Sequence, residues 1–102
     1  MNIQSLAIHR AGLLQRVAEA AIKFGNGISA STVRVLITLS AWADINCETT
    51  MSVSEIAKHS CVSILTARKS TKILATHGMI EVSCNYDPED GSTTANTYKV
   101  II

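Results

Sequence analysis

The sequence predicts a single α+β domain, with helices up to Gly78 and a pair of β-strands after it. Apolar residues recur at helical spacing before that glycine, and apolar and polar residues alternate after it. The 102 residues match the length of one ordinary domain, and the hydrophobic share of 47% is enough for a core. Since only 17% of the residues are charged, the composition is not that of a disordered chain.

The first helix is expected from Leu6 to Phe24, because two neighbouring apolar stripes run through this segment. The stripes consist of Leu6, Leu13, Val17, Ala21 and Phe24, and of Leu14, Ala18 and Ile22. Together they are wider than one buried face needs, so the extra width either covers the domain's own core or pairs with a second chain. Glycines at positions 25 and 27 end the helix. Residues 1–28 are therefore treated as a candidate dimerisation arm, and residues 29–102 as the main domain.

The second helix is predicted to lie at the centre of the domain, because it is apolar around most of its circumference. It begins at a serine cap, either Ser29 or Ser31. Its two apolar faces are expected to carry Val33, Leu36, Ile37 and Ser40, and Val35, Leu39 and Trp42. Polar residues from 44 to 48 mark its end, and Thr49 to Ser52 can form a very short strand.

Two further helices follow in close succession. The segment Ser52–Glu55 fits a capping box, which places the start of a short helix at Val53. Ser63 can cap the next helix, which runs towards Gly78. Two helices joined by about four residues are a helix-turn-helix candidate.

A β-hairpin with a long polar loop is expected after Gly78. The first strand covers Met79 to Cys84, and the second covers Thr97 to Ile102. The loop between them contains Pro88 and Gly91, which favour a turn, together with the acidic residues Asp87, Glu89 and Asp90.

The helix that follows Ser63 separates small and apolar residues from cationic ones. Counting about 100° per residue, its inner face carries Ala67, Ser70, Ile73, Leu74 and His77, and its outward face carries Leu65, Arg68, Lys69 and Lys72. Residues 63–78 contain three basic and no acidic side chains, whereas residues 79–102 contain one basic and four acidic ones. The formal net charge of +1 therefore hides a polarised chain, in which this helix would attract a DNA duplex. The alternative is a surface helix whose charges are merely solvated.

Residues 31–102 resemble the winged helix-turn-helix domains of bacterial, phage and plasmid DNA-binding proteins. The resemblance is carried by residues 51–57, Val62–Ser63, Leu74, Gly78–Val82 and Asn96–Val100. It implies a three-helix core, a C-terminal β-hairpin wing and, in this chain, an extra N-terminal helix. It also implies that recognition-helix positions facing DNA are occupied by Ser63, Leu65, Thr66, Arg68, Lys69 and Lys72.

Two features depart from that family. The turn position often occupied by glycine is Cys61, and the tip of the wing, often basic, is acidic. Thr93, Thr94 and Asn96 remain as donors from the wing to phosphates.

The sequence therefore predicts sequence-specific binding of double-stranded DNA by a homodimer, as a small transcriptional repressor or regulator. The alternatives are a plasmid or phage partition or replication factor, and a winged helix that contacts another protein through its acidic wing. We expect no enzyme, cofactor or metal, because His9, His59 and His77 lack partners at catalytic spacing and the three cysteines form no Cys-x-x-Cys pair.

A cytoplasmic protein is expected, with no membrane segment. The longest uncharged stretch that reads as apolar, Val35–Ala43, is about half the length of a membrane span. Arg10, Arg16 and Glu19 interrupt the first helix in a way that a signal peptide does not tolerate.

Overall fold

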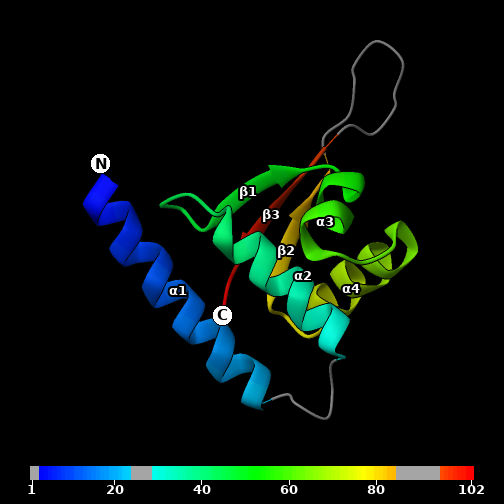
Figure 1. Ribbon diagram of the computed structural model, residues 1–102, viewed down its shortest axis with the longest axis horizontal. Coiled ribbons are helices and arrows are strands. Elements are labelled where there is room, and N and C mark those ends of the chain that lie inside the picture. The colour runs from blue at the N-terminus through cyan, green and yellow to red at the C-terminus, as the bar shows by residue number, and fades with distance from the viewer. Residues whose placement is uncertain (1–2, 24–28, 85–94) are drawn as a thin grey trace.

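The computed structural model describes residues 3–23, 29–84 and 95–102. Over these residues the protein is α+β, with four helices and a small three-stranded antiparallel sheet (Figure 1). The elements are α1 (Ile3–Lys23), α2 (Ala30–Ala41), β1 (Glu48–Met51), α3 (Val53–Ser60), α4 (Ile64–Thr76), β2 (Ile80–Ser83) and β3 (Asn96–Val100). The predicted α+β class and the order of its helices and strands are confirmed.

The sheet has the order β1-β3-β2, so the last strand in the chain lies in the middle. The predicted antiparallel pairing of the two C-terminal strands is confirmed, and β1 adds a third strand on the other side of β3. The register places Lys99 between Glu48 and Glu81. The loop with Asp87, Glu89 and Asp90 lies outside the described residues.

The helices begin where the serine residues predict. Ser29, Ser52 and Ser63 are the N-caps of α2, α3 and α4, and each side chain accepts a hydrogen bond from the backbone N–H three residues later. The predicted capping box at Ser52 is complete, because Glu55 Oε1 accepts from the Ser52 N–H at 3.2 Å. After α4, Gly78 takes a φ of +72°, which only glycine adopts without cost.

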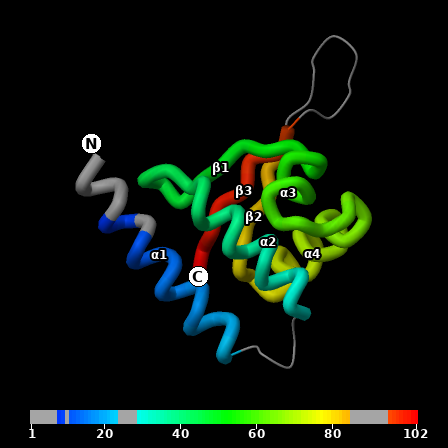
Figure 2. The backbone as a smooth tube through the Cα atoms, in the orientation of Figure 1, coloured from blue at the N-terminus to red at the C-terminus, as the bar shows by residue number. Residues whose placement is uncertain are grey.

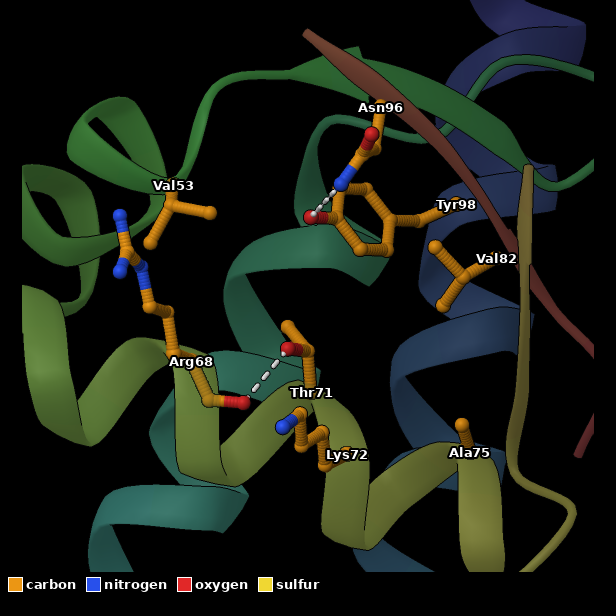
Figure 3. Close-up of a pocket in the computed structure, with 8 residues that line it drawn as sticks. All are labelled: Val53, Arg68, Thr71, Lys72, Ala75, Val82, Asn96 and Tyr98. Atoms are coloured by element: carbon orange, nitrogen blue, oxygen red, sulfur yellow. Dashed lines mark hydrogen bonds between the residues drawn. The ribbon is translucent and has the colours of Figure 1, made fainter. Parts of the chain in front are cut away.

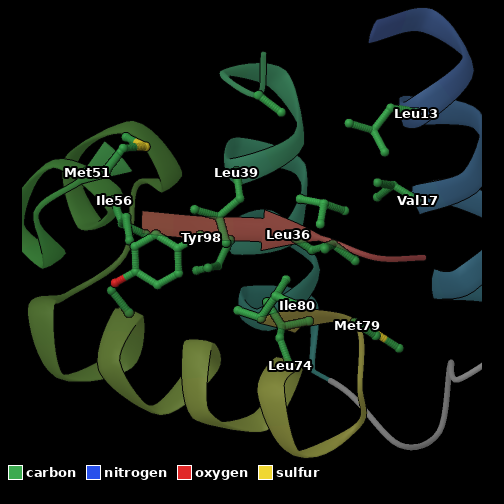
Figure 4. Packing of buried hydrophobic residues seen from close by; sticks show 14 of the residues in the cluster. Leu13, Val17, Leu36, Leu39, Met51, Ile56, Leu74, Met79, Ile80 and Tyr98 are labelled. Atoms are coloured by element: carbon green, nitrogen blue, oxygen red, sulfur yellow. The ribbon is translucent and has the colours of Figure 1, made fainter. Parts of the chain in front are cut away.

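The hydrophobic core lies between α2, α3, α4 and the sheet, and α1 covers one side of it (Figure 4). The side chains with no exposed surface include Leu13, Val35, Leu36, Leu39, Ile56, Ala67 and Leu74. Hydroxyl pairs join α2 to its neighbours, since Thr32 Oγ1 donates to Ser70 Oγ at 3.3 Å and Ser60 Oγ donates to Thr38 Oγ1 at 2.7 Å. Such small side chains allow the helix backbones to approach closely, and α2 is central as predicted.

The structure separates the two apolar stripes of α1. Leu13 and Val17 of the first stripe are buried in the domain's own core, while Leu14, Ala18 and Ile22 of the second are exposed. Leu13 and Val17 thus cover the core, and the second stripe is available to another surface; the side chains of Leu6 and Phe24 lie outside the described residues.

Three orientations expected from helical periodicity are wrong. His77, placed on the inner face of its helix, is exposed, because α4 ends at Thr76 and His77 is its C-cap. Ile37 and Trp42, expected to line apolar faces of the central helix, are 43% and 55% exposed. The other elements cover only part of the circumference of α2, so part of its apolar surface faces solvent.

Candidate nucleic-acid interface

The outward face of α4 is cationic. Leu65, Arg68, Lys69 and Lys72 are all exposed, as their periodicity predicts. The opposite face of the same helix is buried and consists of Ala67, Ser70, Thr71 and Leu74. Since α4 contains no acidic residue, the three cations face solvent without a competing charge on their own helix.

The start of α4 uses two of the predicted site residues for capping. Ser63 Oγ accepts a hydrogen bond from the Thr66 N–H at 3.1 Å and donates to Thr66 Oγ1 at 2.8 Å. Ser63 is exposed, whereas Thr66 is half-buried. These two hydroxyls therefore fix the helix terminus, and the side chains that project outward are those from Leu65 onward.

A surface hollow of about 400 Å³ separates α4 from the strands (Figure 3). It is lined by Val53, Arg68, Thr71, Lys72, Ala75, Val82, Asn96 and Tyr98. The fold thus places Asn96 on the same hollow as Arg68 and Lys72, two predicted site residues from a distant part of the sequence. Leu65 and Lys69 do not line the hollow, and Thr93 and Thr94 lie outside the described residues.

The side chains of Asn96 and Tyr98 meet at one wall of this hollow. Asn96 Nδ2 donates to Tyr98 Oη at 3.3 Å, and Asn96 Oδ1 is buried without a hydrogen-bond partner among the described residues. Burial raises the pKa of the Tyr98 phenol above its ordinary value, although the hydrogen bond from Asn96 acts in the opposite direction. Tyr98 is therefore neutral at neutral pH.

Tyr98→Phe should change the alkaline stability of the protein. Because the pKa of Tyr98 is higher in the folded state, its contribution to stability is complete below the unfolded-state pKa of about 10 and is lost as the pH rises through the folded-state pKa. At neutral pH the free energy of unfolding of the variant should be about 1 kcal/mol lower than that of the unmodified protein, because the Asn96 amide loses its hydrogen-bond acceptor. Urea unfolding from about pH 7 to about pH 11 should show this deficit shrinking. A deficit that stays constant over that range would contradict the assignment.

The turn between α3 and α4 is held by a residue in the left-handed conformation. Cys61 has φ 57° and ψ 44°, a left-handed conformation that favours glycine. The Val62 N–H donates to the Ala57 carbonyl at 3.0 Å and closes the turn. The turn between α3 and α4 is therefore formed without glycine, at the cost of some backbone strain.

Replacing Cys61 by glycine should raise the free energy of unfolding by about 0.5–1 kcal/mol, because glycine adopts positive φ without a steric penalty. Chemical denaturation measures the difference. Cys61→Ala is the matched control, since it removes the thiol and keeps the strain. If the glycine variant were no more stable than the alanine variant, the strain would be absent.

Two side-chain pairs in the structure connect residues far apart in the sequence. His9 Nε2 of α1 lies 3.7 Å from Cys47 Sγ and 3.1 Å from the Asp44 carbonyl oxygen, and thus ties α1 to the turn before β1. The rings of Trp42 and His59 lie 5.2 Å apart. No periodicity or motif in the sequence indicates either pair.

Among the described residues, no group of three or more His, Cys, Asp or Glu side chains is placed to hold a metal ion. In the same part of the chain, no helix has the length and apolar character needed to cross a membrane.

Comparison of the chain with known protein families, characterised proteins and solved structures finds no match. The class of protein is therefore defined by its own architecture, an α+β domain that exposes a cationic helix face beside a small antiparallel sheet.

Proposed function

We propose that this protein is a winged helix-turn-helix protein that binds double-stranded DNA through the outward face of α4. The observation that carries the proposal is the exposure of Arg68, Lys69 and Lys72 on a helix without acidic residues. The order of α3, α4 and the antiparallel strands agrees with the family that the sequence resembles. The buried small residues behind the cationic face support the rigid seating that a recognition helix requires.

The exposed residues suit the two kinds of contact made in a major groove. An α-helix fits this groove, and the N-terminal residues of a recognition helix contact base edges. Leu65, in the first turn of α4, is 62% exposed and is available to a thymine methyl group. Arg68 and Lys72 lie one helical turn apart, so both can follow the same DNA strand.

The hollow beside α4 suits the sugar–phosphate backbone of that strand. Arg68 and Lys72 line it from one side, and Asn96 lines it from the strands. A backbone that passed between α4 and the strands would meet two cations and an amide, while Val82 and Tyr98 limit its depth. These contacts would position the protein, and those of the outer helix face would read the sequence.

The action we propose is that of a small repressor or regulator that works by occupying its site. A single recognition helix contacts few base pairs, and each good pair of contacts gives about 1–3 kcal/mol of discrimination. Two copies on a palindromic site would double the contacted sequence, which is why we include homodimerisation in the proposal.

The test is selection of bound fragments from random and source-genome duplexes, followed by titration of the selected duplex by fluorescence anisotropy. Affinity should fall linearly with salt on a log–log plot, with a slope of about −0.9 for each phosphate contacted. A footprint over a single palindrome supports the regulator, and an extended array of repeats would instead indicate a partition or replication factor. Absence of duplex binding even at low salt would contradict DNA binding altogether and favour a role in protein contact.

A further inference from the structure

The hollow between α4 and the strands has the size and the lining of a small-molecule site. Its volume of about 400 Å³ lies within the range of about 300–1,000 Å³ that is typical of ligand pockets. Val53, Ala75 and Val82 give it aliphatic walls, and Tyr98 adds an aromatic ring. A phosphate group alone would leave these walls in contact with water, so the lining favours a ligand with an apolar body.

The charged residues of this hollow are both cationic. Arg68 and Lys72 extend into it from α4, and Asn96 and Tyr98 project from β3 on the other side (Figure 3). None of the eight described residues that line it is acidic. Because Arg68 and Lys72 are four residues apart on one helix, a single anionic group can contact both. Figure 2 shows α1 and α4 on opposite sides of α2, so α1 does not cover the hollow.

Tyr98 adds a hydrogen-bond donor to the wall that faces these cations. Its side chain is only 1% exposed, and its Oη accepts a hydrogen bond from Asn96 Nδ2 at 3.3 Å. The hydroxyl hydrogen of Tyr98 has no acceptor among the described residues. Since burial raises the pKa of the phenol, this hydrogen is retained at neutral pH. A buried donor beside two cations calls for a ligand that carries both a negative charge and an acceptor oxygen.

We propose that the hollow binds a small carboxylic acid with an apolar body, in its ionised form, and that the bound acid displaces DNA from α4. The carboxylate lies between Arg68 and Lys72 and accepts from the Tyr98 hydroxyl, while the apolar body covers the aliphatic walls. The displacement rests on the proposed function, because the acid and the DNA backbone need the same two cations. The ligand site itself does not depend on DNA binding.

Titration of the full chain with naphthoate, followed by backbone amide NMR shifts, tests the ligand site with no DNA present. We expect saturable binding with a Kd of about 1 mM or lower, as is ordinary for a ligand of this size. Naphthalenemethanol lacks the charge and inorganic phosphate lacks the rings, so each should bind at least about tenfold more weakly. The site would be overturned if naphthoate showed no saturation by about 10 mM, or if phosphate bound equally well.

Two lysines of α4 provide matched variants for the same titration. Lys72 lines the hollow, whereas Lys69 is exposed on the same helix and does not line it. Lys72→Ala should raise the Kd of naphthoate at least about fivefold, and Lys69→Ala less than about twofold. Tyr98→Phe keeps the ring, removes the donor and should raise this Kd at least about fivefold. Circular dichroism confirms that the variants fold. Equal effects of the two lysine variants, or an unchanged Kd in Tyr98→Phe, would contradict the assignment.

The displacement is measured by anisotropy with the selected duplex at constant ionic strength. Naphthoate at about ten times its Kd should weaken the apparent affinity for the duplex about tenfold, and naphthalenemethanol at the same concentration should leave it unchanged. If naphthoate bound to the protein and the affinity for DNA stayed the same, displacement would be wrong and DNA binding would stand. If the protein bound no duplex at all, the proposed function and the displacement would fall together, whereas the NMR titration would still decide the ligand site.

Discussion

Removing the Arg68 and Lys72 side chains together is expected to weaken specific DNA binding by at least about 30-fold, because each cationic contact contributes about 1–3 kcal/mol. Both residues are exposed, so the free energy of unfolding should change by no more than about 0.5 kcal/mol. The slope of log affinity against log salt should become shallower by up to about 2. Anisotropy titrations of the double alanine variant at several salt concentrations measure both effects.

Arg16→Ala combined with Arg34→Ala is the matched control for this experiment. These arginines are exposed on α1 and α2, and their removal changes the net charge by the same amount. Their loss should leave the affinity for the selected duplex within about threefold of that of the unmodified protein, because salt screens their longer-range attraction to the DNA. An equal loss of affinity after replacing Asp87 and Glu89 by alanine would instead place the DNA surface elsewhere.

The second large effect concerns two leucines of the same helix. Leu74 has no exposed surface and belongs to the core, so Leu74→Ala should lower the free energy of unfolding by about 2–5 kcal/mol. Leu65 is 62% exposed, and Leu65→Ala should change stability by less than about 0.5 kcal/mol. Urea or thermal unfolding of the two variants gives the comparison.

The same two variants should show the opposite order in DNA binding. Leu65→Ala removes a contact on the outward face, whereas Leu74→Ala leaves that face intact as long as the protein is folded. Titrations at a temperature where both variants are folded make this measurement. A larger loss of stability from Leu65→Ala than from Leu74→Ala would mean that α4 is turned the other way.

The helices could be predicted because their signals are local. Caps at Ser52 and Ser63 depend on hydrogen bonds within three residues, and the inner face of α4 follows from its periodicity. Periodicity failed at His77 because the helical rotation no longer applies past the last turn, where its ring Nδ1 turns back to donate to the Ile73 carbonyl oxygen at 2.9 Å. It failed at Ile37 and Trp42 because the number of elements that cover a helix is a property of the whole fold.

The candidate site could be predicted only in part. The cationic face of α4 is visible in the sequence, because Arg68, Lys69 and Lys72 are close neighbours on one helix. The hollow beside them is not visible, because Asn96 reaches it only through the pairing of β3 with β2. The contact of His9 with Cys47 likewise depends on how α1 packs across the domain. Such long-range placements depend on the packing of elements and not on local propensity.

The middle position of β3 has a consequence for how the chain acquires its structure. Both other strands pair only with β3 within the described sheet, and β3 follows them in the chain. During synthesis from the N-terminus, β1 and β2 therefore have no strand to pair with until Asn96 to Val100 has been made. The helical part can collapse earlier through its closer neighbours, so closure of the sheet is the late step. A chain truncated before Asn96 would expose β1 and β2 without their partner strand, and unpaired strand edges recruit chaperones or seed aggregation.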